Sequence, residues 1–99
     1  MTREETLQAA IQAVTQDREN EYGAPEDNFA VIAAMWEAYV KSRCVGGDAP
    51  VCIVADDVAI MMCLLKIARI TTGETKADSY VDLAGYAACA AEIATGGRE

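Results

Sequence analysis

Apolar residues recur every three to four positions along four stretches of the chain, and this spacing predicts four helices. The expected helices cover about residues 4–20, 25 or 27 to 42, 55–71 and 78–95. Residues 51–54 can form a short extended piece, but the chain offers no second strand to pair with it. We therefore expect an all-α fold with one domain over residues 1–99. It should be a small bundle of three to four helices with a long C-terminal antiparallel helical hairpin.

Turn and cap residues separate these stretches. Thr2 and Glu5 have the spacing of a capping box at the start of the first helix. Gly23 and Pro25 end the first helix and begin the second, because Gly accepts a left-handed backbone and Pro suits a first helical turn. Further boundaries are a loop at 44–50, a tight turn at 72–77, and the Gly pair at 96–97.

The third expected helix is apolar around nearly its whole circumference. Two aspartates begin it, every residue from 58 to 65 is apolar, and only two charges follow. Such a helix should be buried on all sides, and a 99-residue chain has little other protein to surround it. The small residues at 83–91 in the fourth helix allow another helix to approach closely. We therefore expect a homo-oligomer.

Composition and charge support this view and exclude some partners. The chain is 53% hydrophobic and 24% charged, as in globular proteins. A domain this short buries only about 60–65% of its unfolded surface, which leaves apolar surface for a second subunit. The net charge of −8 and the lack of a Lys/Arg stripe argue against nucleic acid. The longest apolar run is too short to span a membrane, and the charged N-terminus is unlike a signal peptide, so we expect a cytoplasmic protein.

Residue types also narrow the possible chemistry. The chain has no histidine, and its four cysteines include no CxxC pair, so Ser–His and Cys–His pairs and familiar zinc spacings are excluded. We expect zinc, iron and disulfides to have no structural role. Carboxylates sufficient for a magnesium site are present, although a helix start attracts aspartate for electrostatic reasons alone. These carboxylates are Glu37, Asp56, Asp57, Asp78, Asp82 and Glu92.

The predicted hairpin brings together charges from both of its helices. Counting outward from the turn places Lys66 roughly opposite Asp82 and Arg69 roughly opposite Asp78 or Ser79, with Tyr86 one turn beyond Asp82. One interpretation is a set of interhelical salt bridges, since buried charges must be paired. The other is a site in which the two cations hold phosphate oxygens and the carboxylates orient them or bind ribose. Both interpretations stay open.

A second cluster surrounds the turn between the first two helices. Arg18, Tyr22, Asn28 and Phe29 lie within twelve residues of one another, although a turn itself needs only Gly and Pro. An aromatic ring beside a guanidinium and an amide can stack on and recognise a base or ribose. The alternative is that Tyr22 and Phe29 only hold two helices together.

Three blocks of sequence resemble an uncharacterised family of small phage and prophage proteins. They read YGxPExNF at 22–29, DVAxMMxLLKxAR at 57–69 and DSYVDxAGY at 78–86, and the resemblance covers about residues 7–94. More distantly, they are similar to the MazG-like all-α nucleotide pyrophosphohydrolases. That resemblance implies an oligomer whose helical hairpin binds magnesium and a triphosphate through E-x-x-E and E-x-x-D motifs.

The chain departs from the enzyme pattern at the magnesium ligands. Glu37 is the single acid where E-x-x-E is needed, and Ser79 stands where E-x-x-D has its glutamate. We therefore expect a phage-encoded oligomer that sequesters a nucleotide or nucleotide-derived signal in the host cytoplasm without cleaving it, by analogy with phage proteins that counter host defence. The alternatives are a magnesium-dependent MazG-like pyrophosphohydrolase and a helical protein-interaction module.

Overall fold

The fold is all-α, as predicted. The computed structural model describes residues 1–44, 50–73 and 76–97, and none of these residues forms a strand. Its elements are α1 (Arg3–Gln12), the π-helical turn η1 (Ala13–Asp17), α2 (Arg18–Tyr22), α3 (Pro25–Arg43), α4 (Ala55–Thr72) and α5 (Ala77–Thr95). The predicted loop at 44–50 and turn at 72–77 lie partly outside the described residues.

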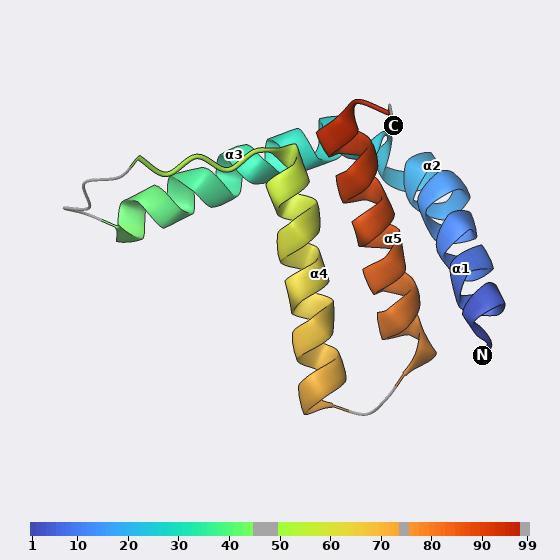
Figure 1. The fold of residues 1–99 in the computed structure, drawn as a ribbon. Coiled ribbons are helices and arrows are strands. Elements are labelled where there is room, and N and C mark those ends of the chain that lie inside the picture. The colour runs from blue at the N-terminus through green and yellow to red at the C-terminus, as the bar shows by residue number, and fades with distance from the viewer. Residues whose placement is uncertain (45–49, 74–75, 98–99) are drawn as a thin grey trace.

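Three helical rods lie roughly side by side, and a fourth crosses them (Figure 1). α4 and α5 run antiparallel, and the continuous rod of α1, η1 and α2 flanks α5 on its other side. α3 crosses the end of this layer where α4 begins, and its C-terminal half extends beyond α4. Among the described residues, no helix combines the length and the apolar character that crossing a membrane requires.

The predicted caps are present at the helix ends. Thr2 Oγ1 accepts a hydrogen bond from Glu5 N–H at 3.1 Å, and the Glu5 carboxylate accepts one from Thr2 N–H at 2.9 Å. Gly23 ends α2 with a φ of +82°, a conformation that side chains disfavour, and Pro25 opens α3. The predicted capping box and the predicted helix break at Gly23 and Pro25 are therefore confirmed.

The first predicted helix is not a uniform α-helix. At η1 it widens into a π-turn, in which Arg18 N–H donates to the Ala13 carbonyl five residues back. The Gln12 amide reaches Asp17 across the same spacing at 3.3 Å, and Thr15 Oγ1 donates to the Ile11 carbonyl at 2.6 Å. Such side-chain bonds to the backbone bend helices, and π-turns occur often at functional positions. Arg18 follows directly after this turn.

The core lies where α3, α4 and α5 meet. Val58 is fully buried, and alanines and cysteines around it let the helices approach closely. Its buried members are Phe29, Ala33, Val58, Ala59, Cys63, Tyr86, Cys89 and Ala90.

The single chain does not cover α4 completely, and its burial on all sides was expected only with a second subunit. This helix is not buried on all sides, because Ile60 and Leu64 expose 51% and 59% of their surface. Within the part of the chain that the structure describes, only α3 and α5 pack against α4, so apolar side chains on its remaining side face outward.

Candidate functional site

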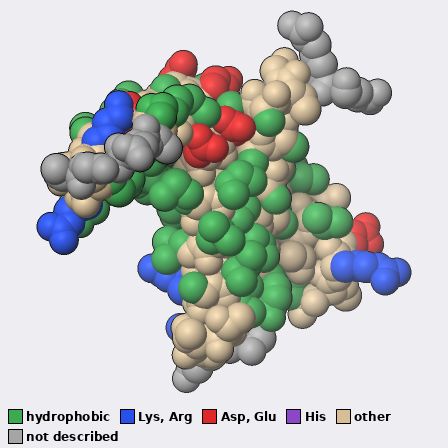
Figure 2. Space-filling model, turned by 60° about the vertical axis from the view of Figure 1, so that its left-hand side comes forward, with side chains coloured by type: hydrophobic (Ala, Val, Ile, Leu, Met, Phe, Trp, Pro, Cys, Tyr) green, Lys and Arg blue, Asp and Glu red, His purple; other side chains and the backbone are tan. Residues whose placement is uncertain are grey.

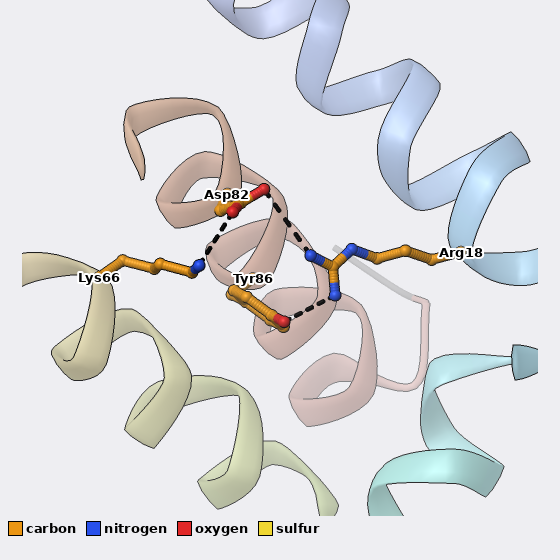
Figure 3. A network of polar contacts seen from close by, with 4 residues as sticks. All are labelled: Arg18, Lys66, Asp82 and Tyr86. Carbon is orange, nitrogen blue, oxygen red and sulfur yellow. Dashed lines mark hydrogen bonds and ion pairs between the residues drawn. The ribbon is translucent and has the colours of Figure 1, made fainter. Parts of the chain in front are cut away.

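A polar network centred on Asp82 joins three helical rods (Figure 3). Lys66 on α4 places its Nζ 3.0 Å from one carboxylate oxygen, and Arg18 on α2 places Nη2 3.7 Å from the other. Arg18 Nη1 also donates a 2.6 Å hydrogen bond to the Tyr86 hydroxyl on α5. The predicted opposition of Lys66 and Asp82 is therefore confirmed, while their role toward a ligand stays a prediction.

The network carries more positive than negative charge. Two cations share one carboxylate, so Arg18, Lys66 and Asp82 have a formal sum of +1 in a chain of net charge −8. The Lys66 side chain is only 12% exposed, whereas that of Arg18 is 39% exposed. Arg18 therefore retains donors that an anion from solvent can reach, and partial burial strengthens such contacts.

Aromatic rings hold the Arg18 side chain in place. Its guanidinium carbon lies 4.8 Å from the centre of the Tyr86 ring, within the range of a cation–π contact. The Tyr86 ring in turn lies 6.2 Å from the ring of Phe29 in the core. The guanidinium is thus oriented by an ion pair, a hydrogen bond and a ring face together.

Two hollows adjoin Arg18 and Tyr86. Between the first rod and α5 is a crevice of about 30 Å³, which has room for about two water molecules. On the side of α3 and α4 is a groove of about 250 Å³. The groove is lined by Arg18, Tyr22, Asn28, Phe29, Ile32, Trp36, Val58, Met62 and Tyr86. Of these two hollows beside Arg18, the groove is the one large enough to accept part of an organic ligand.

The groove brings together the whole of the second predicted cluster. Arg18, Tyr22, Asn28 and Phe29 all line it. Tyr22 is 59% exposed and offers a ring face, whereas Phe29 is 8% exposed and belongs to the core. The stacking role predicted for this cluster thus fits the geometry of Tyr22 better than that of Phe29, which mainly packs helices together.

The predicted patch of hairpin charges forms only in part. Arg69 is exposed and lines a depression with Lys76 and Ser79 near the turn of the hairpin, which agrees with its expected position opposite Asp78 or Ser79. Among the described residues, neither Arg69 nor Asp78 takes part in the Asp82 network, and Asp78 is exposed. Lys66 and Arg69 lie three residues apart on α4, as expected, but of these two only Lys66 contacts Asp82. Arg18 joins Asp82 from a different rod instead.

Three of the carboxylates considered for magnesium serve other contacts. Asp57 caps α4 by accepting from Val54 N–H at 2.9 Å, and Asp82 pairs with the two cations. Glu37 accepts from Ile53 N–H at 2.8 Å and pairs with Lys41 at 3.3 Å. The hydrogen bond from Ile53, aided by Lys41, lowers the pKa of the Glu37 carboxyl. Within the described ranges, no three Cys, Asp or Glu side chains gather as a metal site would require.

The four cysteines are free thiols of two kinds. Cys44 and Cys52 are exposed, whereas Cys63 and Cys89 are buried between α4 and α5. Burial raises the pKa of both buried thiols. These two cysteines behave as small core residues.

Part of the groove was not predicted. Its apolar wall is formed by four residues that were not predicted as site residues, namely Ile32, Trp36, Val58 and Met62. Trp36 could have indicated this wall from the sequence, because it is the single tryptophan and lies seven residues after Phe29 on the same helical face.

The chain is similar to phage proteins over most of its length. The family described as "Domain of unknown function (DUF6378)" matches residues 5–94. The Gene 55 protein of Mycobacterium phage D29 is 34% identical over 91 residues, which are 91% of this chain and 54% of that protein. The Gene 55 protein of Mycobacterium phage L5 is 37% identical over 81 residues, or 82% of this chain and 47% of that protein. The chain spans about half the length of these relatives, and no solved structure matches it.

Proposed function

This chain belongs to the DUF6378 family, which includes phage proteins, and we propose that it binds a nucleotide or nucleotide-derived molecule in the groove beside Arg18. In this proposal it acts stoichiometrically, as a symmetric oligomer that sequesters its ligand without cleaving it. By binding a signalling nucleotide of the host cell, such a protein would lower the concentration of the free signal and so counter host defence.

The observation that carries the proposal is the composition of the groove wall. Four of the six aromatic residues of the chain line it, beside one guanidinium and one carboxamide. Flat aromatic surface suits a base, because stacking contributes about 1–3 kcal/mol per base in proteins that bind single strands. Asn28 supplies both a donor and an acceptor for the edge of such a base.

Arg18 supplies the contact for an anionic group. Its guanidinium is oriented by Tyr86 and Asp82 yet remains partly exposed, and the network has a positive excess. A planar guanidinium binds phosphate oxygens through paired hydrogen bonds. The groove volume of about 250 Å³ lies below the ~300 Å³ of pockets that enclose a whole ligand, so the phosphate end would lie at the surface beside Arg18.

The arrangement of carboxylates favours binding over hydrolysis. Glu37, Asp57 and Asp82 are each held by backbone N–H groups or cations. A magnesium-dependent pyrophosphohydrolase would need several carboxylates to turn toward one ion. It remains the second candidate function, favoured by the nearness of Asp82 to the groove-lining Arg18.

A ligand-release experiment tests the proposal. The purified protein is incubated with magnesium and a panel of nucleotides, cyclic nucleotides and ADP-ribose derivatives, then separated from free ligand and heated. We expect one compound to be retained and released unchanged. Release of an altered compound would establish the enzyme instead. Retention of none of the panel would contradict the proposal and favour a protein-interaction module.

Variants locate the site of any retained compound. We expect Tyr22→Ala to weaken its binding by about 5- to 100-fold, the loss of one stacked base. Arg18→Met should cost about 10- to 100-fold for a phosphate contact, while Lys66 keeps Asp82 paired. The matched control is Tyr80→Ala, which removes an exposed tyrosine on α5 that does not line the groove. Equal losses in all three variants would place the site elsewhere.

A further inference from the structure

α3 and α4 leave a broad apolar surface uncovered. Figure 2 shows hydrophobic side chains gathered over both helices on one side of the molecule. On α3 the exposed residues recur every four positions, and on α4 they fill one side of the helix. The α3–α4 face consists of Val31, Met35, Tyr39, Ile60, Met61, Leu64, Leu65 and Ile67.

The size of the α3–α4 face matches what a stable dimer needs. Its residues are 39% to 68% exposed. With ordinary side-chain areas these fractions amount to about 800 Å² of apolar surface, which is the share that one partner contributes to a standard interface. Monomeric proteins rarely expose a contiguous apolar patch larger than about 300–600 Å². The face therefore exceeds what a monomer ordinarily shows to water.

The shape of the molecule leaves room for a partner on this side. The radius of gyration is 15.0 Å, whereas a compact domain of this length has about 13 Å. The excess arises because the C-terminal half of α3 extends beyond α4 at a steep angle (Figure 1). The two helices thus form an open corner rather than a closed bundle.

From these observations we infer that a second copy of this chain covers the α3–α4 face. The two α4 helices pack antiparallel across a two-fold axis near Leu64, the middle of the helix. An isologous contact of this kind needs a self-complementary surface, and α4 has one. It is acidic in its first turn, with Asp56 and Asp57, and carries Arg69 in its last, so antiparallel pairing sets each acidic end beside a basic one.

A second copy would also border the proposed binding groove. Trp36 and Met62 line the groove, and each directly follows a residue of the α3–α4 face, Met35 and Met61. The dimer rests on the exposed surface alone and does not depend on a ligand. Its failure and the failure of nucleotide binding are therefore distinguishable.

The test compares two equally exposed leucines. Leu64 on the face is 59% exposed, and Leu7 on α1 is 58% exposed and lies outside it. We expect sedimentation of the unmodified chain at micromolar concentration to show a dimer. Leu64→Glu should weaken that dimer at least about 30-fold, the effect of losing an interface hot spot, whereas Leu7→Glu should leave it unchanged. A monomeric unmodified chain, or a dimer that survives Leu64→Glu, would overturn the inference.

Cross-linking keeps the test informative if Leu64→Glu unfolds the chain. In a background of Cys44→Ser and Cys52→Ser, which removes the exposed thiols, Leu64→Cys should form a disulfide-linked dimer under mild oxidation. Leu7→Cys in the same background should stay mostly uncross-linked. Equal cross-linking of the two variants would contradict a two-fold axis near Leu64.

Discussion

At the scale of single residues, Gly85 determines how closely the first helical rod approaches α5. A Cβ atom at this position would lie 2.9 Å from Cγ1 of Val14, closer than side chains pack. Val14 is β-branched and cannot easily rotate away. The glycine in the DSYVDxAGY block is thus explained by packing, and it allows the first rod to reach α5.

Replacing this glycine should therefore cost stability. Gly85→Ala gains about 1 kcal/mol of helix propensity but overpacks the contact by about 1–3 kcal/mol, so we expect a net loss of up to about 2 kcal/mol in denaturant unfolding. In a Val14→Ala background the clash disappears, and Gly85→Ala should become neutral or stabilising. A more stable single variant would show that the rods are not in close contact here.

Lys66 and Arg69 differ in burial, and this predicts different costs of removal. Lys66→Met leaves Asp82 with only the longer contact to Arg18, so we expect a loss of about 1–3 kcal/mol in unfolding free energy. Adding Asp82→Asn should recover much of it. Arg69→Met is the matched control on the same helix, and because Arg69 is exposed it should change stability by less than about 0.5 kcal/mol. Equal losses for Lys66→Met and Arg69→Met would contradict the described network.

The thiols should fall into two reactivity classes. Cys44 and Cys52 are exposed, whereas burial both covers Cys63 and Cys89 and raises their pKa. Because the thiolate is the reactive form, we expect an alkylating agent at pH 8 to label the first two rapidly and the last two slowly. Peptide mass spectrometry over time measures the order. Rapid labelling of Cys89 would mean that α4 and α5 separate readily.

At the scale of secondary structure, the helices were predictable because each is encoded locally. Spacing of apolar residues, the Thr2–Glu5 capping box and the Gly23–Pro25 break all act within a few residues, and the structure places the helix ends close to the expected ones. The π-turn at η1 was not predictable. Val14 within it and Arg18 directly after it contact Gly85 and Tyr86 of α5, and local sequence patterns do not reveal such contacts between distant residues.

A hydrogen bond between Ile53, just before α4, and Glu37 on α3 should depend on pH. The hydrogen bond that Ile53 N–H donates to Glu37 lowers the pKa of the Glu37 carboxyl. The stabilisation from this hydrogen bond is therefore present above the ordinary carboxyl pKa and is lost as the pH falls through the lowered pKa. We expect Glu37→Gln to speed amide exchange at Ile53 several-fold at neutral pH. The difference from the unmodified chain should vanish in acid, and a difference that persists there would exclude the carboxylate as the cause.

At the scale of the whole molecule, apolar surfaces were easier to predict from the sequence than contacts between charged residues. The excess of apolar residues on α4 was evident from composition, and it appears as exposed side chains. Only half of the Asp82 network was predictable. The register of the hairpin turn places Lys66 opposite Asp82, whereas Arg18 reaches Asp82 only because another helical rod docks on α5. The groove has the same origin, since its lining comes from α2, α3, α4 and α5.

The whole molecule should keep its stability without metals or disulfides. Its four cysteines are free, and the core is made of apolar and small side chains. We expect a chelator with a reductant to shift the melting temperature by less than about 5 °C, which corresponds to roughly 1 kcal/mol for a domain of this size. A larger decrease in a thermal scan would point to a bound metal or to a disulfide between copies.

The contact between Arg18 and Tyr86 also sets an order of events during synthesis. The two residues are 68 positions apart, so the first rod leaves the ribosome long before its docking surface on α5 exists. At about 5–20 residues per second this interval is roughly 3–14 s. During that time Val14 and Arg18 have no partner from α5, so the first rod can dock only after α5 has been synthesised.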